Sequence, residues 1–121
     1  MAKAFDHSYG YTCFMELVYE FDATQKDQVE KKIRQKLKYH KLGAYDAERV
    51  EYIRTLKNEL QAEIGLYKNS EYYSKSASEF TVMADFNMVQ MTADYSARYN
   101  KIEAKDMTAI IGFALYYFYE R

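Results

Sequence analysis

The sequence has no proline, no tryptophan and only one cysteine among its 121 residues. Cys13 alone cannot form an internal disulfide, so the chain carries no mark of an oxidising compartment, and we expect a cytoplasmic protein. Without proline, and with four isolated glycines, the chain shows no linker. We therefore expect a single domain over residues 1–121.

Long apolar stretches are absent as well. The longest one, Met107–Tyr119, has 13 residues, whereas a membrane-spanning helix needs about 20. Residues 1–7 contain no apolar core after Lys3, which does not fit a secretory signal. We expect no membrane association.

Tyrosine is the residue that the chain has in excess, with 14 copies. Its ring is large and rigid and ends in a polar hydroxyl, which suits contact surfaces that stay partly wet. The composition indicates a non-catalytic binding protein that sequesters or inhibits a partner. By analogy, compact tyrosine-rich chains of this kind resemble the accessory inhibitors of phages and mobile elements. The alternative is a structural or assembly subunit whose aromatic surfaces contact only other copies.

The first two thirds of the chain predict one strand and two helices. Residues 11–21 alternate between apolar and mixed positions, as a half-buried strand does. A helix is expected over residues 24–42, with Thr24 as its N-cap, and a second one over residues 46–68. The connection around Gly43 is short and predicts an antiparallel helical hairpin. The inward-facing positions of the two helices are Val29, Ile33, Leu37, Val50, Ile53, Leu60, Ile64 and Tyr67.

The last third predicts a loop, two strands and a helix. Residues 69–78 have a loop composition, and residues 80–88 and 89–95 alternate in opposite phases, which indicates two strands or one bulged strand. Residues 103–121 favour a final helix, with a last strand left open. The order β-α-α-β-β-α predicts an α+β fold, in which a helical hairpin and a C-terminal helix cover a small antiparallel sheet.

A homo-oligomer is expected from the apolar surface that this fold leaves uncovered. The segment Met107–Tyr119 is apolar nearly all round, and the strand at residues 11–21 has apolar residues on both faces. One copy of the chain supplies too little partner surface for both, so further copies are expected to cover them.

No pattern of catalytic or metal-binding residues appears. The adjacent Asp-His-Ser of residues 6–8 cannot form a triad, because triad members meet through space from separate positions. The two histidines and Cys13 lack metal-ligand spacing, and Cys13 falls on the inward phase of its segment. Glu16 and Glu20 share the less apolar face and are expected to be solvated. We predict no enzyme, no cofactor and no metal site.

The charge pattern singles out residues 24–42 as a candidate binding element. They hold seven of the 17 lysines and arginines against two acids, a local charge of +5. A basic stripe opposite the apolar stripe, together with two tyrosines in a serine-rich loop, predicts a site for a nucleotide-like anion or a host protein. The overall charge of −1 argues against dedicated duplex DNA binding, and a merely solvated lysine face is the alternative. The predicted ligand-binding residues are Lys31, Arg34, Lys38, Lys41, Tyr72 and Tyr73.

Overall fold

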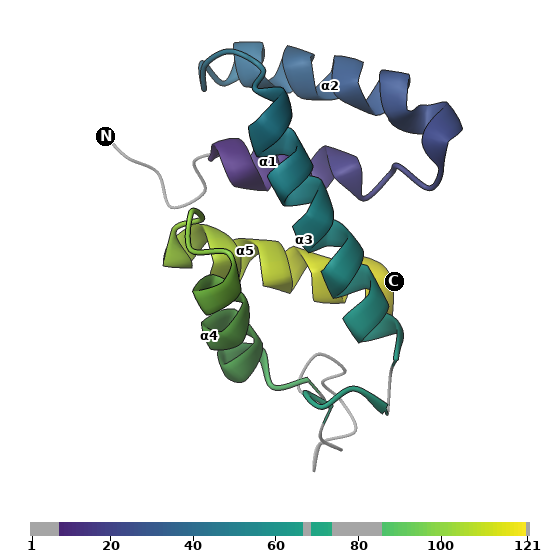
Figure 1. The fold of residues 1–121 in the computed structure, drawn as a ribbon, viewed down its shortest axis with the longest axis vertical. Coiled ribbons are helices and arrows are strands. Elements are labelled where there is room, and N and C mark those ends of the chain that lie inside the picture. The colour runs from purple at the N-terminus through teal and green to yellow at the C-terminus, as the bar shows by residue number, and fades with distance from the viewer. Residues whose placement is uncertain (1–7, 67–68, 74–85, 121) are drawn as a thin grey trace. The chain divides into compact units, whose positions relative to one another are not determined.

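The computed structural model describes residues 8–66, 69–73 and 86–120 (Figure 1). Its elements are α1 (Tyr9–Leu17), a 3-10 turn η1 (Ala23–Gln25), α2 (Lys26–Tyr39), α3 (Ala47–Gly65), α4 (Met88–Arg98), α5 (Ala104–Leu115) and a π-helical turn η4 (Tyr116–Glu120). The described residues hold no strand, and their one β-bridge is an isolated pair, Tyr73 with Phe86. The predicted α+β fold with an antiparallel sheet is therefore wrong, and the described chain is all-α.

Helix α1 lies where the alternating pattern predicts a strand. Ser8 caps it, because its hydroxyl oxygen accepts a hydrogen bond from the backbone N–H of Tyr11 at 3.0 Å. Among its buried residues, Gly10, Cys13, Phe14 and Leu17 follow the spacing of three and four residues of one helix face, and Tyr9 and Thr12 are buried as well. Cys13 and Leu17, four residues apart, fit an alternating period as well as a helical one, whereas the adjacent buried pair Cys13 and Phe14 fits only the helical period.

Helix α4 occupies the second predicted strand, residues 89–95. The side chain of Asn87 accepts a hydrogen bond from Gln90 N at 3.0 Å and caps the helix. Met91 and Tyr95, one turn apart, are buried, whereas Val89 is 83% exposed although the strand pattern places it inward. The phase flip in the sequence marks the start of a helix rather than a bulge.

The three predicted helices are confirmed in outline as α2 (Lys26–Tyr39), α3 (Ala47–Gly65) and α5 (Ala104–Leu115). Helix α2 begins at Lys26, and its N-cap is Gln25, which makes no side-chain capping hydrogen bond, so the prediction of Thr24 as N-cap is wrong. Asp22 Oδ1 instead accepts from Thr24 N at 2.8 Å, at the 3-10 turn that precedes the helix. Asp46 caps α3 by accepting from Arg49 N at 3.2 Å. The inward positions that the structure describes are buried, namely Val29, Ile33, Leu37, Val50, Ile53, Leu60 and Ile64.

The chain divides into two compact units, unit 1 (Met1–Thr55) and unit 2 (Leu56–Arg121), and α3 contributes to both. In unit 1, α2 packs along α1 instead of forming the predicted hairpin with α3 (Figure 1). The Tyr9 hydroxyl donates to Ala44 O at 2.9 Å and accepts from Asp46 N at 2.7 Å, so the start of α1 holds the α2–α3 connection. The Arg49 guanidinium covers the Tyr9 ring, 4.0 Å from its centroid.

In unit 2, α4 packs against α5. A Cβ at position 112 would lie 3.3 Å from the Met88 methyl, so Gly112 lets the two helices approach closely. The buried residues of α5 are Met107, Ile110, Ile111, Ala114 and Leu115. The apolar segment from which an oligomer is predicted is therefore largely covered within its own chain.

Several sequence predictions lie outside the described residues: those on residues 6–7, Tyr67, the serine-rich loop beyond Tyr73 and residues 80–85. Among the helices of the described residues, none has both the length and the apolar content that crossing a bilayer requires.

Candidate binding site

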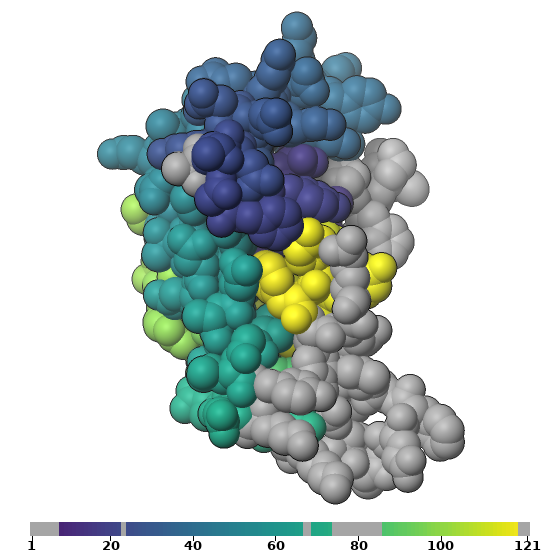
Figure 2. Space-filling view, turned by 90° about the vertical axis from the view of Figure 1, so that its right-hand side faces the viewer, coloured from purple at the N-terminus to yellow at the C-terminus, as the bar shows by residue number. Residues whose placement is uncertain are grey.

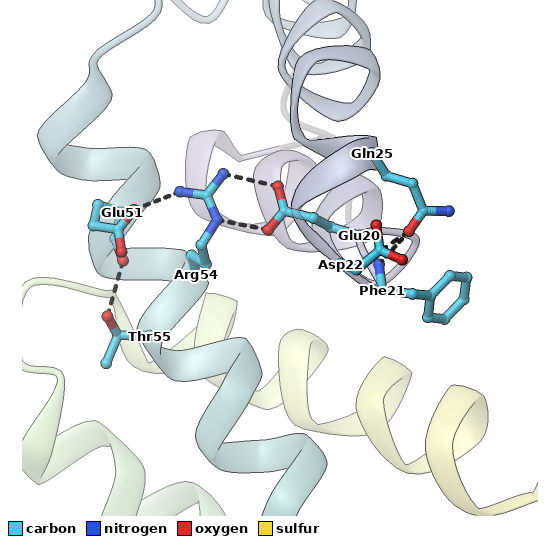
Figure 3. A network of polar contacts seen from close by, with 7 residues as sticks. All are labelled: Glu20, Phe21, Asp22, Gln25, Glu51, Arg54 and Thr55. Atoms are coloured by element: carbon cyan, nitrogen blue, oxygen red, sulfur yellow. Dashed lines mark hydrogen bonds and ion pairs between the residues drawn. The ribbon is translucent and has the colours of Figure 1, made fainter.

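The connection between α1 and α2, residues 18–25, is held in place by short polar contacts (Figure 3). The side-chain oxygen of Gln25 accepts from the backbone N–H groups of Phe21 at 2.7 Å and Asp22 at 3.1 Å. Asp22 Oδ1 accepts from Thr24 N at 2.8 Å and from the Thr24 hydroxyl, and these hydrogen bonds lower the pKa of Asp22. Side-chain hydrogen bonds thus hold the backbone of this connection between α1 and α2, where no α-helix does so.

This connection carries two exposed aromatic rings. Tyr19 is 50% exposed and Phe21 is 64% exposed. Large apolar side chains are more often covered in a folded domain, so two of them on one short connection make a candidate contact surface. Figure 2 faces this part of unit 1, where the dark blue residues of the connection lie at the surface.

The two rings line a hollow of 520 Å3 that lies entirely within unit 1. One wall comes from the end of α1 and the connection, and the other from one flank of α2. Apolar, cationic and amide groups all line it, together with a single carboxylate. The lining residues are Glu16, Tyr19, Phe21, Gln25, Gln28, Val29, Lys32 and Lys36.

Lys32 and Lys36 give this hollow its positive charge. They are four residues apart on α2, so their side chains leave the same face of the helix, with about 6 Å between Cβ atoms. Neither forms an ion pair with any residue that the structure describes. Two ammonium groups against Glu16 leave the hollow with a local excess of positive charge.

The predicted basic stripe lies on the other flank of α2. Lys31 and Lys38 are exposed there. Arg34 is engaged within unit 1, because its guanidinium donates to Glu30 Oε2 at 3.0 and 3.2 Å and lies 4.1 Å from the centroid of the Tyr45 ring. Lys41 follows the helix with a positive φ of 56°. None of these four residues lines the hollow.

The predicted tyrosines belong to unit 2, so neither unit brings them together with the basic stripe. Tyr72 is 4% exposed, and its hydroxyl donates to Asp94 Oδ2 at 2.7 Å. Burial raises the pKa of Tyr72, and the hydrogen bond to Asp94 adds to this effect. Tyr73 is half-buried and meets Phe86 edge to face, with 5.6 Å between the ring centroids. The position of Tyr72 is that of a packing residue.

Comparisons with protein-family models, with curated proteins and with solved structures found no match. The function is therefore argued from the residues of this chain.

The remaining candidates for chemistry offer little. Cys13 is fully buried, and burial raises the pKa of its thiol to about 12, so the reactive thiolate is scarce at neutral pH. His40 is the C-cap of α2 and contacts the ring of Tyr39. Across the described residues, no three or more His, Cys, Asp or Glu side chains come together as a metal would require.

Sequence reasoning missed Tyr19, Phe21, Lys32 and Lys36 as a group. The strand prediction placed both rings on an inward face. The helical wheel of residues 24–42 was divided only into an apolar face and a basic face, so the flank that carries Lys32 and Lys36 was not considered. Asp22, two residues before Thr24, is the signal that indicates a turn and a helix start at this point.

Proposed function

We propose that this protein is a non-catalytic binding protein that holds a nucleotide-like anion in the hollow of unit 1. The observation that carries the proposal is the pairing of two exposed rings, Tyr19 and Phe21, with two lysines, Lys32 and Lys36, around one space. Aromatic rings stack on flat bases, and lysine ammonium groups neutralise phosphates. A ligand with a flat apolar part and a charged part matches both.

The size and charge of the hollow favour a small ligand over a long nucleic-acid strand. A volume of 520 Å3 lies within the range of about 300–1,000 Å3 typical of small-molecule sites. Two lysines match one to three phosphates, whereas a polymer needs a longer basic track. Gln28 and Glu16 add an amide and a carboxylate to the lining, which suit hydrogen bonds to the edge of a base.

The proposal is one of sequestration rather than turnover. The lining supplies groups that bind and orient a ligand, and holding a nucleotide lowers its free concentration or blocks its use by a partner. A cytoplasmic location belongs to the same proposal, since a lone buried Cys13 suits a reducing compartment.

Isothermal titration calorimetry tests the proposal with ATP, ADP, AMP, adenosine and tripolyphosphate as probes. We expect ATP to bind more tightly than adenosine or tripolyphosphate, because only ATP uses both the rings and the lysines. Affinity should fall as salt rises, since exposed charges are screened over about 10 Å at 0.1 M ionic strength.

Two matched variants separate the two flanks of α2. Lys32→Glu with Lys36→Glu reverses the charge of the hollow, and Lys31→Glu with Lys38→Glu makes the same charge change on the other flank. We expect the first pair to weaken ATP binding by about 10-fold or more, and the second by about 2-fold or less. Equal losses would indicate long-range attraction only. A loss confined to the second pair would move the site to the predicted basic stripe.

An acidic peptide with one phenylalanine completes the probe set. If this peptide binds the hollow and no nucleotide does, the ligand is a protein segment and the nucleotide proposal is wrong.

A further inference from the structure

The most enclosed ion pair of unit 1 joins α3 to the connection that carries the two rings. Arg54 Nε lies 2.7 Å from Glu20 Oε1, and its Nη2 lies 3.0 Å from Glu20 Oε2. The side chains of Arg54 and Glu20 are only 12% and 10% exposed. A two-bond fork between arginine and a carboxylate fixes the orientation of both groups, because the guanidinium is planar and rigid.

A second carboxylate steadies the same guanidinium. Arg54 Nη1 also donates to Glu51 Oε1, and Figure 3 shows Arg54 between Glu51 and Glu20. The Thr55 hydroxyl donates to the backbone oxygen of Glu51 at 3.0 Å, within the same turn of α3. The hydrogen bond to Glu20 contributes most to raising the pKa of Arg54, so the guanidinium stays charged.

The ion pair of Arg54 with Glu20, here called the clamp, matters because of where Glu20 stands in the chain. Glu20 stands between Tyr19 and Phe21, the two residues whose rings line the hollow. Gln25 holds the backbone N–H of Phe21 at 2.7 Å from within the connection, whereas Arg54 holds Glu20 from α3. Two independent ties thus converge on three consecutive residues, and Arg54 itself does not line the hollow.

We propose that Arg54 is a positioning residue for the hollow, which sets ligand affinity by holding Tyr19 and Phe21 in their binding conformation before a ligand arrives. A ring that is already in place loses little conformational entropy on binding, so the clamp raises affinity without touching the ligand. This inference rests on the proposed function, because it assumes that the hollow is where a ligand binds.

The alternative is that the clamp only stabilises the fold. Buried ion pairs contribute little to stability on average, because removing two charges from water offsets most of their attraction. A purely stabilising pair would affect all of unit 1, whereas a positioning pair should affect residues 19–22 and ligand affinity while the rest stays unchanged.

Arg54→Lys is the central variant, because it keeps the charge but loses the fork. Backbone 15N order parameters of Tyr19 to Asp22 should fall from about 0.85 to below about 0.6, while those of Ile33 and Leu37 stay at wild-type values. The ATP affinity of the same variant should fall by about 5–10-fold. Arg98→Lys is a control for the substitution itself, since Arg98 forms an exposed, single-bond ion pair with Glu59, at 3.1 Å, in unit 2. It should change neither measurement.

Glu20→Gln gives a second route to the same answer if Arg54→Lys does not fold. The amide keeps the shape of Glu20 and removes its charge, and we expect the same pair of changes with smaller size. An ordered connection in both variants, or a loosened connection with unchanged ATP affinity, would overturn the positioning role alone. Failure of the wild-type chain to bind any probe in the hollow would overturn the proposed function and the positioning role together.

Discussion

In unit 1, Tyr19 and Phe21 are at least half exposed, on a connection that hydrogen bonds hold in place, whereas in unit 2 three tyrosines are buried. Tyr72 donates to Asp94 at 2.7 Å, and Tyr95 stacks on Tyr99 with 6.4 Å between the ring centroids. Between these two groups, aromatic residues serve exposed surface in one case and packing in the other, and each unit also holds the opposite kind, since Tyr9 and Phe14 are buried in unit 1 and Tyr116 is exposed in unit 2. What separates the two uses is how far each ring is buried within its own unit.

The largest expected difference is in stability. Tyr95→Ala should lower the free energy of unfolding by about 3–5 kcal/mol, because it removes a ring that is 2% exposed and leaves a cavity. Phe21→Ala should change the same quantity by about 0.5 kcal/mol or less, because the ring is mainly in water. Urea unfolding followed by circular dichroism measures both. Similar losses in the two variants would show that Phe21 is a core residue and would end the comparison.

Ligand binding should show the reverse order. Phe21→Ala should weaken ATP binding by about 1–3 kcal/mol, the usual value of one ring stacked on one base, which is roughly 5-fold to 150-fold in affinity. Tyr72→Phe should leave ATP affinity within about 2-fold, since its hydroxyl is directed to Asp94. Calorimetry on the two variants decides. A loss in Tyr72→Phe as large as in Phe21→Ala would return Tyr72 to the binding site.

The sequence was sufficient for the long helices and insufficient for the short ones. Val29, Ile33 and Leu37 repeat over three turns, so their period identifies α2 without any knowledge of its neighbours. Helix α1 has nine residues, and over so short a window Cys13 and Leu17 fit a period of two as well as a helical one. The decisive signals for the short helices are single capping residues, Ser8 and Asn87, which a period count ignores.

The candidate site was predictable only as far as its helix. The excess of lysine singles out α2 as a candidate binding element, but the flank that borders a hollow depends on where the connection from α1 lies. The connection is positioned by Arg54, which is 34 residues away from Glu20 in sequence. Such a long-range contact leaves no local pattern, which is why the helical wheel singles out Lys31 and Lys38 and not Lys32 and Lys36.

Alkaline pH offers a smaller test of the buried tyrosines in unit 2. Burial is the main cause that raises the pKa of Tyr72 and Tyr99, and nearby Asp94 and Glu59 add to it. In the unfolded chain a tyrosine ionises at about pH 10. Because the folded pKa is higher, this stabilising contribution is complete below about pH 10 and is lost as the pH rises further. Tyr72→Phe should therefore show a shallower fall in unfolding free energy between about pH 9 and 11 than the wild type. Parallel curves for the two proteins would contradict this assignment.

The smallest expected effect concerns self-association, which stays a prediction. The structure leaves less uncovered apolar surface to support it than the sequence analysis assumes. Helix α5 covers most of its apolar residues within the chain, and among the described residues of unit 2 the exposed large apolar side chains are Leu66, Val89 and Tyr116. We expect light scattering at micromolar concentration to give at least twice 14.4 kDa, and Val89→Lys to shift the mass towards the monomer, because a charge in an apolar contact is costly. ATP affinity should be unchanged by that substitution, since the hollow lies in unit 1.

A mass of 14.4 kDa at every concentration would show that the chain stays a monomer and that the oligomer prediction is wrong. Dissociation by Phe21→Ala instead of Val89→Lys would show that the exposed rings of unit 1 bind a second copy of the chain rather than a nucleotide.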